Sequence, residues 1–219
     1  MLVKDFITKE IPVLKSFDTV EYALSLMDDC KVRHLPLLKG SIYHCLISDK
    51  ELLSATDPKE AIGESVFFAP AVKENSHLHE VLALMTRYGL SVLPVINVGG
   101  EYLGVITQQK VIDAFAELCN AEAAGSIIVL ELLPQDYSLS EIARIVESNN
   151  AHILNLFSTL DKDTGRLQMT IKINLEDASP VIRSFERFNY TIVYHFMKTG
   201  MVDDVLQKRM NELLHYMNM

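Results

Sequence analysis

The sequence is poor in cysteine, and its cysteines form no pattern. Cys30, Cys45 and Cys119 are odd in number, and no C-x-x-C spacing occurs among them. This excludes a framework of paired disulfides. Unpaired thiols fit a reducing compartment, so a cytoplasmic protein is expected.

Long apolar runs and clusters of basic residues are also missing. The longest apolar candidate, residues 91–106, is interrupted by Pro94 and by Gly99-Gly100, so no membrane-spanning helix is expected. The N-terminal segment contains no apolar core of the kind found in a signal peptide. The net charge is −9 with no Lys/Arg cluster, which disfavours nucleic acid as a direct partner.

The short motifs that mark common catalytic sites are absent. The chain contains no G-x-S-x-G, no phosphate-binding P-loop, no H-E-x-x-H and no G-x-G-x-x-G. His77 and His79 form the only close histidine pair, and a spacing of two on a helix would direct their rings to different faces. We therefore expect no catalytic residues, no metal site and no cofactor. An enzyme that turns over an adenine nucleotide is kept as an alternative.

What the sequence does contain is an internal repeat. When the chain is aligned with itself, segment 11–27 matches 69–85, so that Pro12 meets Pro70 and Met27 meets Met85. The second copy then has one extra residue, after which 46–48 matches 105–107. Each copy is too short to build an adequate core alone, so the copies should pack together with a ligand cleft between them.

Each copy predicts the order β-α-β-β-α. Apolar residues at helical spacing predict helices over 20–27 and 78–85, with Asp18 and Ser76 as their N-caps. Two apolar strands follow in each copy, and Gly99-Gly100 supplies the positive φ of the second hairpin. The final helices begin near Ser48 and Thr107 and end near Leu53 and Leu118.

The C-terminal third has a different pattern. Strands are predicted over 126–133, 151–160, 167–175 and 190–197, with a helix from 139 and another opened by Pro180. Strict alternation in 167–175 predicts that Leu167, Met169, Ile171 and Ile173 face the core. The order βαββαβ is that of a ferredoxin-like domain. Residues 202–217 predict one more amphipathic helix. The fold class is therefore α/β (α+β): two β-α-β-β-α repeats followed by a ferredoxin-like module.

The repeats resemble a tandem pair of cystathionine-β-synthase (CBS) domains, or Bateman module. The resemblance is carried by residues 32–37, by Leu93-Pro94-Val95 and by 104–107, and it places the two repeats at 1–60 and 61–122. It implies binding of an adenosine-containing ligand: AMP, ADP, ATP or S-adenosylmethionine. In the family, a Ser/Thr at the strand-to-helix junction lies near phosphate, and an Asp three residues later binds both ribose hydroxyls.

Carried over position by position, the resemblance puts Ser48 and Thr107 at the Ser/Thr positions. The Asp positions hold Glu51, which can still accept from a ribose, and Lys110, which can only donate but could meet a phosphate. Cys45 stands where the second copy has Gly104. The predicted nucleotide-binding residues are Ile11, Arg33, His34, Ser48, Glu51, Pro70, Thr107 and Lys110.

Residues 126–198 resemble an ACT domain, a regulatory module that often binds amino acids, and 199–219 would form a C-terminal helix. The loop that holds the ligand in that family, Asp-x-Pro-Gly, corresponds to residues 134–137, where Tyr137 stands at the Gly position. The domain order resembles that of acetoin-utilisation-type CBS–ACT proteins.

Three non-enzymatic interpretations stay open beside that of an enzyme. The first is a non-enzymatic sensor of an adenine nucleotide, acting as a homodimer on a separate effector protein. The second is a dimerisation scaffold whose ligand sites are degenerate. The third is an amino-acid sensor that acts through the ACT-like domain.

Overall fold

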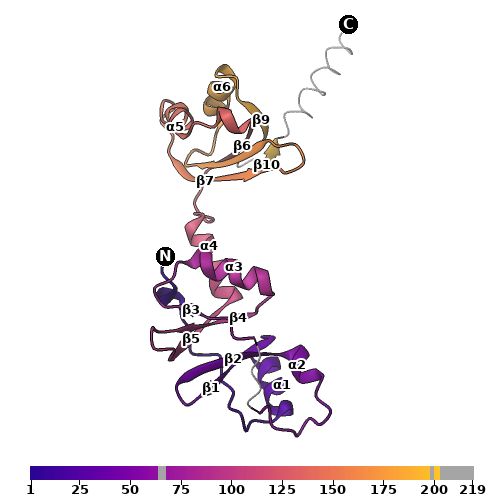
Figure 1. The fold of residues 1–219 in the computed structure, drawn as a ribbon. Coiled ribbons are helices and arrows are strands. Elements are labelled where there is room, and N and C mark those ends of the chain that lie inside the picture. The colour runs from indigo at the N-terminus through magenta and orange to yellow at the C-terminus, as the bar shows by residue number, and fades with distance from the viewer. Residues whose placement is uncertain (64–67, 198–199, 203–219) are drawn as a thin grey trace. The chain divides into compact units, whose positions relative to one another are not determined.

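The computed structural model describes residues 1–63, 68–197 and 200–202. The chain divides into two compact units, Met1–Phe115 and Ala116–Met219. The first unit contains the two sequence repeats up to the last helix of the second, and the second unit contains the βαββαβ segment (Figure 1).

The first repeat begins with a 3-10 turn, η1 (Val3–Phe6), followed by α1 (Val20–Asp29), β1 (His34–Lys39), β2 (Ile42–Ser48) and the short α2 (Asp49–Leu53). The second has β3 (Val72–Lys73), α3 (Leu78–Tyr88), β4 (Val92–Ile96), β5 (Tyr102–Thr107) and α4 (Gln108–Leu118). The predicted order β-α-β-β-α is confirmed in the second copy. In the first copy the helices and the hairpin are confirmed, but an isolated bridge at Leu14 stands in place of the first strand.

The repeats also agree in strand register. Val72 pairs in parallel with Val95 in the second copy, and the equivalent residues of the first, Leu14 and Leu37, form a parallel bridge. Each hairpin is antiparallel with one register shift, between Leu37/Leu38 and between Val95/Ile96. The parallel pairing covers two residues, and so forms the strand β3, only in the second copy; in the first copy it is a single bridge.

The predicted helix caps were wrong by one position in each copy. Thr19, not Asp18, caps α1 by accepting a hydrogen bond from the Tyr22 amide, while His77, not Ser76, caps α3. Asp18 instead accepts from the amide of Lys15. In the second hairpin only Gly100 of the Gly-Gly pair has a positive φ, +82°, while Asn97 Oδ1 accepts from Gly99 and Glu101.

The two repeats exchange their leading segments. The first residues of the first repeat bind the second repeat: the Thr8 amide donates to Val105 O at 2.8 Å, and the Val105 amide donates back to Thr8 O at 3.0 Å. Reciprocally, Leu46 N of the first repeat donates to Phe68 O, in the leading segment of the second repeat. Buried side chains of both repeats form one continuous apolar core, as expected for copies that cannot fold alone.

The second unit contains β6 (Ser126–Leu132), the turn η2 (Pro134–Asp136), α5 (Leu139–Glu147), β7 (Ile153–Leu160), β8 (Leu167–Ile173), α6 (Ser179–Arg187), β9 (Thr191–Met197) and β10 (Gly200–Val202). The strand order β10-β9-β6-β8-β7, with every neighbouring pair antiparallel, confirms the ferredoxin-like prediction. Helices α5 and α6 cover the same face of the sheet (Figure 1).

The core of this unit follows the alternation read from the sequence. Met169, Ile171 and Ile173 are fully buried beneath the helices, together with Ile142 and Phe185. The helix predicted over 202–217 falls almost wholly on residues outside the described ones; at its first residue, Val202, the chain is in β10. Within the described ranges, no helix combines the length and apolar character needed to cross a membrane.

Candidate functional site

A cavity of about 250 Å³ lies between the two repeats. One side comes from β1, β2 and α2, and the other comes from the segment that leads into the second repeat and from the end of α3. The lining residues are His34, Leu46, Ser48, Glu51, Phe68, Tyr88 and Leu90. Three predicted site residues, His34, Ser48 and Glu51, therefore meet in one place.

Ser48 and Glu51 bind each other at the start of α2. The Glu51 Oε2 atom accepts from both the amide and the hydroxyl of Ser48, each at 2.7 Å. The Glu51 amide donates to Ser48 Oγ at 3.2 Å, which completes a capping box. The sequence Ser-x-x-Glu thus folds locally into a helix start, and it holds a carboxylate at the cavity wall.

His34 joins the repeats at the other side of the cavity. Its Nδ1 accepts from the amide of Ser91 at 3.2 Å and lies 3.0 Å from Ser91 Oγ, which itself accepts from the Arg33 amide. Because Nδ1 is an acceptor, the neutral ring carries its proton on Nε2. Burial, and then the Arg33 guanidinium, lower the pKa of His34 below its usual 6.5.

Arg33 and Ser91 occupy equivalent positions of the two repeats. Each carbonyl accepts from the first amide of the helix in its own repeat, Asp49 N to Arg33 O and Gln108 N to Ser91 O. The contacts among Arg33, His34 and Ser91, which we call the Arg33–Ser91–His34 junction, therefore join equivalent positions of the two repeats.

The remaining predicted residues of the first cleft lie elsewhere. Ile11 packs against the apolar core, and Pro70 is buried with its carbonyl accepting from the Tyr43 hydroxyl at 3.0 Å. The Arg33 side chain is exposed, and its Nη2 donates to Gly89 O at 3.4 Å. None of these three lines the cavity.

The second cleft departs further from the prediction. Thr107 Oγ1 accepts from the Lys110 amide, so Thr107 caps α4, but Lys110 is exposed and cannot complete a capping box. Gly104 is needed for close approach, although to the chain itself: a Cβ there would lie 2.5 Å from Ile7 Cγ2 and 2.7 Å from Thr8 O. The leading segment, at Ile7 and Thr8, therefore lies directly against β5 at this position.

Two aromatic residues of the cavity were missed from the sequence. The Phe68 and Tyr88 rings are in contact, with centroids 4.5 Å apart and planes tilted by 58°, and each residue is nearly half exposed, at 48% and 44%. Both aromatic residues come from the second repeat, whereas His34, Ser48 and Glu51 come from the first. Exchange of the leading segments brings Phe68 to the first cleft, and the signal was the aromatic residue just ahead of Pro70.

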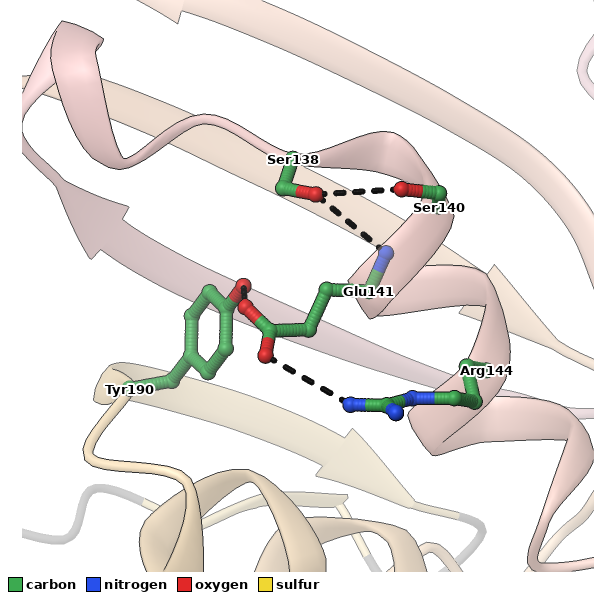
Figure 2. A network of polar contacts seen from close by, with 5 residues as sticks. All are labelled: Ser138, Ser140, Glu141, Arg144 and Tyr190. Atoms are coloured by element: carbon green, nitrogen blue, oxygen red, sulfur yellow. Dashed lines mark hydrogen bonds and ion pairs between the residues drawn. The ribbon is translucent and has the colours of Figure 1, made fainter.

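The second unit has its own cavity, of about 430 Å³, beside the loop 134–137. It is lined by Glu131, Leu132, Leu133, Asp136, Glu141, Arg166, Phe188, Asn189, Tyr190 and Thr191. Figure 2 shows its polar edge, where the Tyr190 hydroxyl donates to Glu141 Oε2 at 2.9 Å and Arg144 pairs with Oε1 at 3.7 Å. Burial and the Glu141 carboxylate raise the pKa of Tyr190 to about 12.

The histidine pair is arranged differently from the expectation. Because His77 is the N-cap and not a residue of α3, its ring stacks on His79, with centroids 4.9 Å apart and the two Nδ1 atoms at 3.0 Å. Among the described residues, no third His, Cys, Asp or Glu joins the two into a metal-binding group.

Comparison with known families matches residues 3–57 and 69–117 to the CBS domain. An uncharacterized protein of Methanocaldococcus jannaschii is 26% identical over 112 residues, which are 50% of this chain and 27% of the relative. The chain thus spans about a quarter of the length of that relative.

Two solved structures each resemble about half of this chain. A CBS domain pair/ACT domain protein from Thermotoga maritima is 18% identical, with 53% of this chain and 98% of that chain covered at a TM-score of 0.49. CBSX2 in complex with AMP is 26% identical, with 53% and 97% covered at 0.47. The family match falls on both sequence repeats, so the N-terminal half of this chain is a tandem pair of CBS domains.

Proposed function

We propose that the chain is a regulatory protein that binds an adenosine compound in the cleft between its CBS domains. The observation that carries this proposal is the cavity in which two accessible aromatic rings face a Ser–Glu pair and a neutral histidine. Such a mixture of flat apolar walls and a few fixed polar atoms is the usual make-up of a small-molecule site.

The aromatic side of the cavity suits a purine base. Leu46 and Leu90 give it an apolar floor, and the Phe68 and Tyr88 rings stand at its rim. Stacking of a base on an aromatic side chain contributes about 1–3 kcal/mol. Covering these rings would also remove apolar surface from water, which favours binding.

The polar side of the cavity suits a ribose. Glu51 receives two hydrogen bonds from Ser48 on Oε2, and a carboxylate has about four acceptor sites in all. The remaining sites can accept from sugar hydroxyls without breaking the helix cap. This role for Glu51, and the contacts of Ser48 and His34, are part of the proposal.

Regulation would follow from the shared lining. A ligand that touches both repeats favours the arrangement in which both walls are in place, so its binding shifts the balance between arrangements of the repeats. The Arg33–Ser91–His34 junction adjoins the cavity and would report the change. We propose that the output passes to a homodimer partner or to a separate effector protein, without catalysis.

The test is thermal unfolding of the chain with AMP, ADP, ATP, adenosine and S-adenosylmethionine added separately. A ligand at about 100 times its dissociation constant adds about 2.7 kcal/mol. For a chain of this size that corresponds to a rise in Tm of about 5–10 °C. Replacing Phe68 with Ala should abolish the rise, whereas Phe17→Ala, at a ring that is 71% exposed and outside the cavity, should preserve it.

Absence of any rise with all five compounds would reject the proposal and favour a scaffold whose clefts are degenerate. Release of a product from ATP or AMP over hours would instead indicate an enzyme.

A second candidate function is supported by the cavity of the second unit. Its position beside loop 134–137 is where the ACT resemblance implies an amino-acid ligand, and Asp136 and Glu141 could accept from an α-ammonium group. A panel of amino acids in the same assay tests it, with Tyr190→Phe as the variant at the cavity wall. No stabilisation by any amino acid would reject this candidate.

A further inference from the structure

We infer that the first cleft selects an adenosine compound that lacks phosphate, either a neutral nucleoside or a sulfonium nucleoside such as S-adenosylmethionine, over AMP, ADP and ATP. This inference rests on the proposed function and specifies its ligand class. It is carried by the charges at the cavity wall and by the hydrogen bonds already made there.

The first observation is the sign of the charge on the residues that line the cavity. Among the lining residues that the structure describes, Glu51 alone is an acid or a base that is charged at neutral pH, and neither Lys nor Arg is present. A phosphate group that enters would leave water and meet a carboxylate. Burial of an uncompensated anion is strongly unfavourable.

The second observation is that the backbone donors at the start of α2 already have partners. The amide of Asp49 donates to Arg33 O at 2.9 Å, that of Lys50 to Asp49 Oδ1 at 2.7 Å, and that of Glu51 to Ser48 Oγ. Ser48 donates both its amide and its hydroxyl to Glu51. From Ser48 to Glu51, the strand-to-helix junction therefore offers a phosphate no free backbone donor.

The third observation concerns the histidine. The amide of Ser91 donates to His34 Nδ1, which fixes an uncharged ring with its N–H at Nε2. Burial and the neighbouring Arg33 lower the pKa of His34, so the ring is neutral at physiological pH. It can donate one hydrogen bond to a hydroxyl or a ring nitrogen, but it supplies no positive charge.

Two cationic residues near the cavity, Arg33 and Lys50, do not line it and do not offset the negative charge of Glu51. Arg33 donates to Gly89 O, and Lys50 is exposed with Asp49 beside it. A base and a ribose need only stacking surface, acceptors and one donor, all of which the cavity provides. A cationic sulfonium substituent would in addition be attracted by Glu51.

The experiment is calorimetric titration of the full chain with adenosine, S-adenosylmethionine, AMP and ATP at one ionic strength. We expect at least one unphosphorylated compound to bind tenfold or more tightly than AMP. Glu51→Gln keeps an acceptor for the helix cap and removes the charge, so it should bring AMP closer to adenosine in affinity. Lys50→Gln is the matched control, and it should leave their ratio unchanged.

A second measurement does not depend on any variant. Inorganic phosphate at millimolar concentration, with ionic strength held constant, should fail to displace the unphosphorylated compound. Binding of AMP or ATP as tightly as both unphosphorylated compounds, or displacement by phosphate, would overturn this inference and leave the proposed function standing. Absence of binding by all four compounds would overturn both.

Discussion

Replacing Gly104 with Ala is the sharpest test of how the two repeats are joined. At this position φ is +148°, and a Cβ would lie 2.7 Å from the carbonyl oxygen of Thr8. The Ile7 side chain, 2.5 Å away, can rotate, but the Thr8 carbonyl cannot move without breaking the hydrogen bond that it accepts from the Val105 amide. Alanine should therefore detach the leading segment from β5.

The magnitude follows from what is lost. Two hydrogen bonds between Thr8 and Val105 contribute about 1 kcal/mol each, and an unfavourable backbone conformation costs about 1–3 kcal/mol. We expect a loss of about 3–5 kcal/mol, or a fall in Tm on the order of 10–20 °C for the first unit. Gly40→Ala is the control: it has φ +63° but no atom within 4 Å of the added Cβ, so only about 1–2 kcal/mol should be lost.

Denaturation followed by circular dichroism gives the stability, and hydrogen exchange at the Thr8 and Val105 amides gives the location. A loss below about 1 kcal/mol for Gly104→Ala, with both amides still protected, would show that the close approach does not hold the repeats together.

Three further outcomes are expected. Ser91→Ala removes the acceptor of the Arg33 amide and should destabilise the chain by about 1 kcal/mol in urea denaturation, with no loss meaning that water replaces the hydroxyl. His34 has a folded-state pKa lowered from 6.5, so its contribution to stability is present above pH 6.5 and is lost as the pH falls below it; His34→Gln should flatten this part of the stability–pH curve, and an unchanged curve would refute it. Tyr190→Phe removes the hydrogen bond to Glu141 and should cost about 1 kcal/mol, whereas a neutral result in thermal unfolding would show that solvent screens it.

The fold could be predicted largely from periodicity. Repeated apolar spacing indicated the order of elements in both copies, and alternation at Met169, Ile171 and Ile173 identified the buried face of β8. The helix caps were missed because Asp18 and Thr19 are both good capping residues in adjacent positions. Which of the two caps the helix depends on the path of the preceding turn, which periodicity does not describe.

The site was predictable only in part. His34, Ser48 and Glu51 lie close in sequence to a single strand-to-helix junction, and they do share a cavity. Phe68 and Tyr88 reach that cavity from the other repeat, and no local pattern indicates which copy's segment will cross over. Lys110 was assigned to a cleft by analogy of position alone, and the exchanged segment beside Gly104 shows why equivalent positions can have unlike surroundings.

The exchange of leading segments also bears on how such a chain arises. A single repeat would leave the edge of its hairpin open and its own leading segment unattached, and a second single repeat could satisfy both by mutual swapping. The fused pair keeps the hydrogen bonds of such a swapped dimer within one polypeptide. In a fused pair the two repeats can differ in sequence, because a mutation in one repeat does not occur in the other. Glu51 and Lys110 occupy equivalent positions of the two repeats, as do Cys45 and Gly104. A symmetric dimer of identical chains could not have such differences between its halves.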